Sequence, residues 1–174
     1  MPYIPAFTST TMSNKRTYFG YGSNLWLDQM KRRCPRSKYI GVGVLQDWKW
    51  IINIRGYANI IPSVGDIVYG LMYELTEQDE HDLDIYEGST YSKLNLDVKQ
   101  TASDPLSTPG GVISTLVYVD VLRKSESHPR TEYIYRMNMG IENALAQGVP
   151  KEYIDKYLRA FIPAPDSYVR MAQN

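Results

Sequence analysis

Residues 17–25 read TYFGYGSNL, a short β-branched and aromatic run that stops abruptly at a glycine-rich turn. This pattern predicts a strand that ends at Gly20 and a turn that passes through Gly22. Neither glycine carries a side chain, so the backbone of the turn can approach a ligand closely. The glycine spacing fits neither a phosphate-binding P-loop nor a dinucleotide fingerprint.

The turn is predicted to lead straight into a helix. Ser23 or Asn24 would cap this helix, and Pro35 would end it. The free N–H groups of a first helical turn favour an anionic group such as a carboxylate. A tight turn that binds nothing has the same pattern, so the turn by itself leaves both interpretations open.

Further strands and helices are predicted along the rest of the chain, with the strands mostly consecutive and the helices mostly late. This order indicates a mixed α+β fold, and the repeated short strands fit a curled sheet or a small barrel. We expect strands at residues 39–45, 48–54, 67–75, 91–99 and 112–122, and helices at 76–87, 133–147 and 151–161.

Turn-forming residues separate several of these elements. Residues 46–47 (Gln-Asp) and 65–66 (Gly-Asp) are interpreted as turns between strands. Residues 101–111 are interpreted as a surface loop, because they contain two prolines and a pair of glycines. Gly70 lies inside a predicted strand and indicates a bulge or a close approach of another backbone.

The composition disfavours several classes of function. Nineteen basic side chains balance nineteen acidic ones, which argues against a nucleic-acid partner. The basic residues 31–33 are interpreted as a solvated helix end. No apolar run approaches the length that spans a bilayer, so no membrane partner is expected. Two histidines and a single cysteine, Cys34, disfavour a metal site and a catalytic triad, and one cysteine is typical of a reducing, cytoplasmic location.

The chain is predicted to form one domain. Residues 1–15 are rich in Thr and Ser, lack the apolar core of a signal peptide and are interpreted as a flexible N-terminal leader. No linker or repeat divides residues 16–174, which have the size of one ordinary domain.

Glu87 is a candidate for proton transfer. It ends a predicted helix that starts with a cap-like pattern from Thr76 to Asp79, in which Leu83 and Ile85 are expected to face the core. Its aromatic neighbours would desolvate the carboxyl and raise its pKa. A lone glutamate at a helix end is more often exposed, however, and the pattern alone does not choose it over other carboxylates of this region, namely Asp79, Glu80, Asp82 and Asp84.

Tyrosines are unusually frequent, with fifteen in the chain. Most tyrosines are half-buried packing residues, but some of these are expected to line a pocket with hydroxyls at its rim. The candidates are Tyr18, Tyr21, Tyr86, Tyr91 and Tyr133.

Several motifs together resemble the γ-glutamylcyclotransferase-like (AIG2-like) family. The opening motif YFGYGSNL at residues 18–25 is the most specific, and further motifs follow in the family's order across nearly the whole chain after the leader. They are LQDW at 45–48, ANI at 58–60, GD at 65–66, VYG at 68–70, LDIYEG at 83–88 with Tyr91, PRTEY at 129–133, MG at 139–140 and GVPKEY at 148–153.

The resemblance implies a small mixed β-barrel flanked by α-helices, with no metal and no organic cofactor. It implies intramolecular aminolysis of a small γ-glutamyl amide, giving 5-oxoproline and a free amine, in a monomer or homodimer. By the same implication Glu87 is the acid and base of catalysis, and Tyr91 and Tyr133 contact the substrate. The γ-glutamyl head would be held by Tyr18, Phe19, Gly20, Tyr21, Gly22, Ser23 and Asn24.

One departure from the family pattern concerns the outer half of the substrate. The stretch between Trp50 and Ala58 is shorter than in family members of glutathione metabolism, and the Trp48 and Trp50 pair would suit a bulkier, less polar amine. Two alternatives therefore stay open. One is a recruited enzyme that acts on a biosynthetic or detoxification intermediate, and the other is a non-catalytic binding domain of the same fold.

Overall fold

The computed structural model describes residues 14–101 and 110–165. Most of the predicted leader and of the predicted loop at 101–111 lies outside these residues. Within them, no helix is long and apolar enough to cross a membrane.

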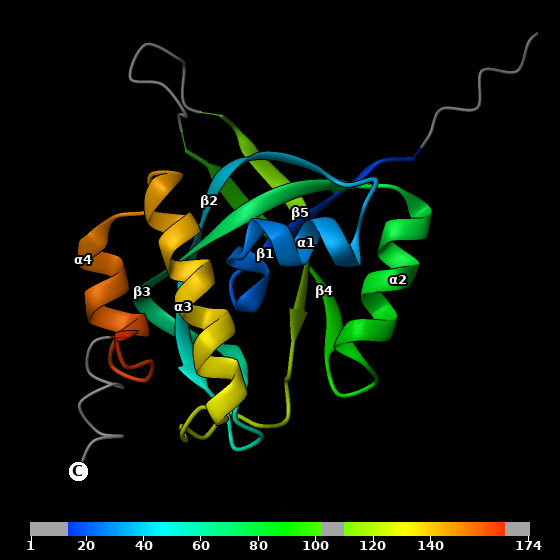
Figure 1. The fold of residues 1–174 in the computed structure, drawn as a ribbon. Helices are drawn as coiled ribbons and strands as arrows, with labels where there is room; N and C mark the ends of the chain where they lie inside the picture. The colour runs from blue at the N-terminus through cyan, green and yellow to red at the C-terminus, as the bar shows by residue number, and fades with distance from the viewer. Residues whose placement is uncertain (1–13, 102–109, 166–174) are drawn as a thin grey trace, which may run out of the picture.

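Five strands close into a mixed barrel, as the sequence predicts (Figure 1). Around the barrel they follow the order β1-β3-β2-β4-β5, and β1 pairs with β5 to close it. That closing pair is parallel, whereas the other neighbours are antiparallel. The strands are β1 (Arg16–Gly20), β2 (Lys38–Ile52), β3 (Ala58–Leu75), β4 (Ser92–Gln100) and β5 (Val112–Val119).

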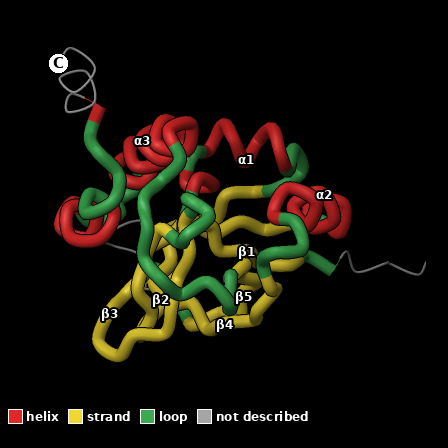
Figure 2. Tube along the Cα trace, turned by 90° about the horizontal axis from the view of Figure 1, so that it is seen from below, coloured by secondary structure: helices red, strands yellow, loops and turns green. Residues whose placement is uncertain are grey.

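The helices gather on one side of the barrel, as Figure 2 shows for α1, α2 and α3. A 3₁₀ turn, η1, follows β1 directly, and α4 continues without a break into the π-helical turn η2. The helical elements are η1 (Ser23–Leu25), α1 (Leu27–Arg33), α2 (Glu77–Glu87), α3 (Thr131–Ala146), α4 (Lys151–Tyr153) and η2 (Ile154–Leu158).

The two turns predicted in the first half of the chain are wrong, because β2 and β3 are each one long strand. Asp47 in β2 and Gly65 in β3 both have positive φ, of 63° and 88°. They face one another across the pair, and the Gly65 N–H donates to Asp47 Oδ1 at 2.9 Å. The turn-forming residues thus mark an irregularity at which the paired strands shift register, and such irregularities bend a sheet.

The predicted start of the first helix is also wrong. Trp26 is the N-cap of α1 and Gly22 that of η1, and neither cap uses a side chain. The side chains of Ser23 and Asn24 are buried and bonded elsewhere, as described below.

Helix α2 follows the sequence prediction closely at both ends. Thr76 and Asp79 form a capping box, and Gly88 ends the helix with φ of 71° directly after Glu87. Leu83 is fully buried, but Ile85 is 67% exposed, which corrects the expectation that both face the core. Residues two positions apart lie on opposite sides of a helix, so only one of them can face inward.

Gly70 confirms the prediction of a close backbone approach. A Cβ on this residue would lie 2.6 Å from the Phe19 ring and 2.7 Å from the Gly20 carbonyl oxygen. Gly43 is its partner across the β2–β3 ladder. Phe19 can therefore lie fully buried against β3, which fixes the end of β1 from which the glycine turn departs.

Candidate active site

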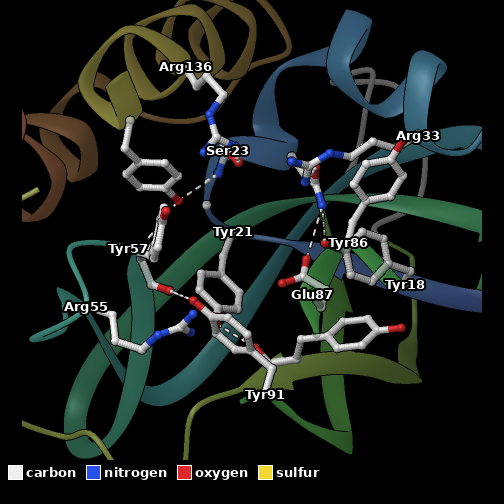
Figure 3. A pocket seen from close by; sticks show the side chains of 15 residues that line it. Tyr18, Tyr21, Ser23, Arg33, Arg55, Tyr57, Tyr86, Glu87, Tyr91 and Arg136 are labelled. Atoms are coloured by element: carbon white, nitrogen blue, oxygen red, sulfur yellow. Dashed lines mark hydrogen bonds between the residues drawn. The ribbon is translucent and has the colours of Figure 1, made fainter. Parts of the chain in front are cut away.

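A pocket of about 220 Å³ opens where the end of β1 meets α1, α2, α3 and the β2–β3 hairpin (Figure 3). It is smaller than the roughly 300–1,000 Å³ of sites for drug-sized ligands, so it suits a small molecule. Its lining residues are Tyr18, Tyr21, Gly22, Ser23, Asn24, Arg33, Arg55, Tyr57, Ala58, Tyr86, Glu87, Tyr91, Tyr118, Tyr133 and Arg136.

The hydroxyl of Tyr133 joins α3 to the glycine turn. Its oxygen accepts hydrogen bonds from the backbone N–H of Ser23 at 3.2 Å and of Ala58 at 3.4 Å. Because the oxygen accepts both bonds, the phenolic hydrogen remains to donate into the pocket. Gly22 leaves the space for this arrangement, since a Cβ there would lie 2.9 Å from the Tyr133 oxygen.

The side-chain amide of Asn24 connects the turn to Glu87. Asn24 Oδ1 accepts hydrogen bonds from Gln29 Nε2 at 2.9 Å and from Arg33 Nη1 at 3.1 Å. Two donors on the oxygen fix the orientation of the amide. Its nitrogen consequently faces Tyr18 Oη at 2.9 Å and Glu87 Oε1 at 3.5 Å.

Glu87 is half-buried at the last position of α2, where Gly88 ends the helix. Loss of hydration raises the pKa of its carboxyl to about 7, and the guanidinium groups of Arg33 and Arg136 oppose this rise by favouring the carboxylate. A carboxyl that titrates near neutral pH can both accept and donate a proton under physiological conditions.

Arg136 supports the turn from α3. It forms a two-bonded ion pair with Glu132, at 3.0 Å for both bonds, and it donates to Ser23 Oγ at 3.3 Å. Gln29 donates to the same hydroxyl at 2.9 Å. The turn is therefore held by polar side chains from two helices, α1 and α3.

All five tyrosines named from the sequence line the pocket. Burial raises the pKa of Tyr18 and of Tyr21 well above 10, so both stay neutral. Tyr21 Oη donates to the Tyr118 carbonyl at 2.5 Å, and Tyr91 Oη donates to the Ala58 carbonyl at 3.0 Å.

Most of the predicted site residues come together in this one pocket. Phe19 and Gly20 do not line it, because Phe19 is fully buried against Gly70 and Gly20 is buried against Asn24. The predicted residues that do line it are Tyr18, Tyr21, Gly22, Ser23, Asn24, Glu87, Tyr91 and Tyr133.

Other sequence expectations lie away from the pocket. Trp50 is fully buried and donates to the Tyr21 carbonyl at 2.9 Å, and Trp48 is not a lining residue either, so this pair does not shape the outer part of the site. Cys34 is fully buried, and burial raises the pKa of its thiol to about 12, so the thiol is poorly suited to act as a nucleophile at neutral pH. Both histidines are exposed, and residues 14–101 and 110–165 contain no group of three His, Cys, Asp or Glu side chains suited to a metal ion.

Polar residues that the sequence pattern does not single out surround the predicted ones. Arg33 belongs to the basic run interpreted as a solvated helix end, yet it stacks over Tyr86 at 4.7 Å and donates to Asn24. The sequence gives no distinguishing signal for the others, because each is a polar residue in an ordinary helix or hairpin. They are Gln29, Arg55, Tyr57, Tyr118 and Arg136.

Comparisons with known proteins agree on one family. The family described as "Gamma-glutamyl cyclotransferase, AIG2-like" matches residues 18–136. The chain is 28% identical over 157 residues to the gamma-glutamylcyclotransferase of Homo sapiens, covering 84% of this chain and 78% of the relative. It is 29% identical over 156 residues to the enzyme of that name from Mus musculus, with the same coverage of 84% and 78%. A solved structure of a gamma-glutamyl cyclotransferase superposes with a TM-score of 0.72 at 26% identity, covering 87% of this chain and 90% of the other.

The burial of Glu87 predicts how stability responds to pH. The pKa of this carboxyl is higher in the folded chain, at about 7, than its ordinary value of 4.5. Between these values the folded state binds more protons, so the free energy of unfolding falls as pH rises. Glu87→Gln mimics the protonated form and should gain stability relative to wild type between pH 5 and pH 8, by up to about 3 kcal/mol. Urea unfolding of both proteins at the two pH values measures this.

Asp82→Asn is the matched control, because Asp82 lies on the same helix but outside this pocket. Any gain that comes only from removing a negative charge of α2 appears in this variant as well. If the Glu87→Gln difference from wild type stays constant with pH, the Glu87 carboxyl is not desolvated.

Proposed function

This chain belongs to the gamma-glutamyl cyclotransferase, AIG2-like family, and we propose that its pocket converts a small γ-glutamyl amide into 5-oxoproline and a free amine. The observation that carries the proposal is the position of Glu87. Its half-buried carboxyl, with a pKa of about 7, faces the amide of Asn24 in the same pocket as the glycine turn.

In the proposed reaction the nucleophile belongs to the substrate. The α-amine nitrogen attacks the γ-carbonyl carbon, a new C–N bond closes the five-membered ring, and the original amide C–N bond breaks. The enzyme therefore needs no nucleophile of its own, which agrees with the inert thiol of Cys34. Its task is to hold the substrate in the attacking conformation and to move one proton.

Glu87 is the proposed proton carrier. The α-ammonium group first loses one proton to solvent, which frees the lone pair of the amine. As a carboxylate Glu87 then takes a proton from this nitrogen as it attacks, and as a carboxylic acid it gives that proton to the departing nitrogen, which leaves as a neutral amine. A pKa near 7 suits both steps at neutral pH, because neither protonation state is strongly disfavoured.

The glycine turn is the proposed cradle for the γ-glutamyl head. The backbone N–H groups of Gly22 and Asn24 donate to no other group within the described part of the chain. Together with the free hydrogen of the Tyr133 hydroxyl, they are available to the α-carboxylate or to the oxyanion that forms during attack. Such donors act strongly because folding has already oriented them.

Several further expectations remain predictions. A cytoplasmic location rests on the single cysteine, and the absence of a nucleic-acid partner rests on the balanced charge. A monomeric or homodimeric state stays a prediction from the family resemblance.

Replacement of Glu87 by Gln should remove the proton carrier and keep the shape of the site. We expect kcat for 5-oxoproline release from γ-glutamyl-alanine to fall by at least ~100-fold, while the protein folds normally. Asp82→Asn, which changes a carboxylate of the same helix, should keep wild-type kcat. Wild-type turnover by Glu87→Gln would eliminate Glu87 as the acid and base.

Replacement of Gly22 by Ala should displace the Tyr133 hydroxyl, because the added Cβ would lie 2.9 Å from it. We expect kcat/KM to fall by about 10- to 100-fold, since one oriented donor is lost. Gly111→Ala is the control, because no heavy atom of the described residues lies within 4 Å of a Cβ there.

A double variant tests whether this loss passes through Tyr133. In a Tyr133→Phe background, which already lacks the hydroxyl, the Gly22→Ala change should lower kcat/KM little further. Full additivity of the two losses would show that Gly22 acts by another route.

A further inference from the structure

Among the described residues, three arginines and a single carboxylate line the pocket, so these side chains carry an excess of positive charge. Two of these arginines donate hydrogen bonds to side chains of the protein. Arg136 is paired with Glu132, and Arg33 donates to Asn24 Oδ1. Both also favour the carboxylate form of Glu87.

Arg55 differs from the other two. Its side chain is half-buried, yet its guanidinium group makes no ion pair and donates no hydrogen bond within residues 14–101 and 110–165. The centroid of the Tyr57 ring lies 5.6 Å from Arg55 Cζ. A half-buried guanidinium that no carboxylate neutralises keeps its donors free for an anion that enters the pocket.

The hairpin that carries Arg55 is rigid. The Asn53 N–H donates to the Tyr57 carbonyl at 3.0 Å, the Gly56 N–H donates to the Asn53 carbonyl at 2.9 Å, and the Arg55 N–H donates to Asn53 Oδ1 at 3.1 Å. Three hydrogen bonds thus hold the short connection between β2 and β3, and they fix the point from which the Arg55 side chain departs.

The segment that precedes α3 braces this hairpin from outside the pocket. Arg130 donates to the Arg55 carbonyl through Nε at 2.8 Å and to the Gly56 carbonyl through its backbone N–H at 3.1 Å. Gly56 has φ of 84° and leaves no room for a Cβ, which would lie 2.7 Å from Arg130 Cγ. These contacts fix the backbone at Arg55 before a ligand arrives.

We propose that Arg55 binds a carboxylate on the amine half of the substrate, so that the enzyme selects γ-glutamyl amino acids and short peptides over γ-glutamyl amines without an acidic group. The proposal rests on the proposed function. A guanidinium fork matches a carboxylate with two parallel hydrogen bonds, which gives both strength and orientation.

The position of Arg55 assigns it to the amine half rather than to the γ-glutamyl head. Figure 3 shows Arg55 beside Tyr91, on a different wall of the pocket from Arg33 and Arg136. The donors proposed for the head belong to the glycine turn and to Tyr133. The two halves of the substrate would therefore meet different walls of the pocket.

Two substrates that differ in one group test the proposal. γ-Glutamyl-alanine carries the carboxylate, and γ-glutamyl-alaninamide replaces it with a neutral amide. We expect Arg55→Gln to lower kcat/KM for γ-glutamyl-alanine by about 10- to 100-fold, mainly through KM, and to change the value for the amide by less than about threefold. Lys124→Gln, which removes an exposed charge outside the pocket, should affect neither substrate.

Equal losses for both substrates would overturn the proposal, since Arg55 would then bind the head or support the fold. Unchanged values for both would overturn it as well. Calorimetry can compare the affinities for the same two compounds without turnover. The proteins are the Glu87→Gln variant and the Glu87→Gln, Arg55→Gln double variant. A wild-type enzyme that releases no 5-oxoproline from either compound would refute the proposed function, and the calorimetric comparison would still decide on Arg55.

Discussion

The site depends on the orientation of one side-chain amide, that of Asn24. Its oxygen accepts from Gln29 and Arg33, so its nitrogen must face Glu87 and Tyr18. Three elements, β1, α1 and α2, therefore meet at a single group that has no freedom to rotate without losing hydrogen bonds. The spacing between the glycine turn and the carboxyl is a consequence of this constraint.

The barrel and helix α2 fix the positions of the two segments that the Asn24 amide connects. Phe19 packs against Gly70, so the end of β1 is fixed on β3, and the turn begins at a defined point. On the other side, the capping box of Thr76 and the stop at Gly88 define the length of α2 and place Glu87 at its last position. Burial at this position then raises the pKa of the carboxyl to about 7. The barrel packing and the capped helix thus set the chemistry of the site.

What the sequence predicts correctly is mostly local in the chain. The strand and turn at 17–25, the cap at Thr76 and the end of α2 each depend on neighbouring residues. The residues around Asp47 and Gly65 have the composition of two turns. Only the pairing of β2 with β3 shows that both strands continue through them. The polar residues that hold the site were missed for a related reason. Gln29 and Arg136 lie 107 residues apart, and in the sequence each is typical of a solvated helix face. Helices α1 and α3 bring the two side chains together around Ser23.

The most direct test of this account is a carbon-13 NMR titration of the glutamate side-chain carboxyls, with Glu87→Gln used to assign the signal of Glu87. The account predicts that this signal titrates near pH 7 and shifts when 5-oxoproline is added. A midpoint near the ordinary 4.5, with no response to 5-oxoproline, would contradict the claim that the carboxyl is desolvated beside the ligand.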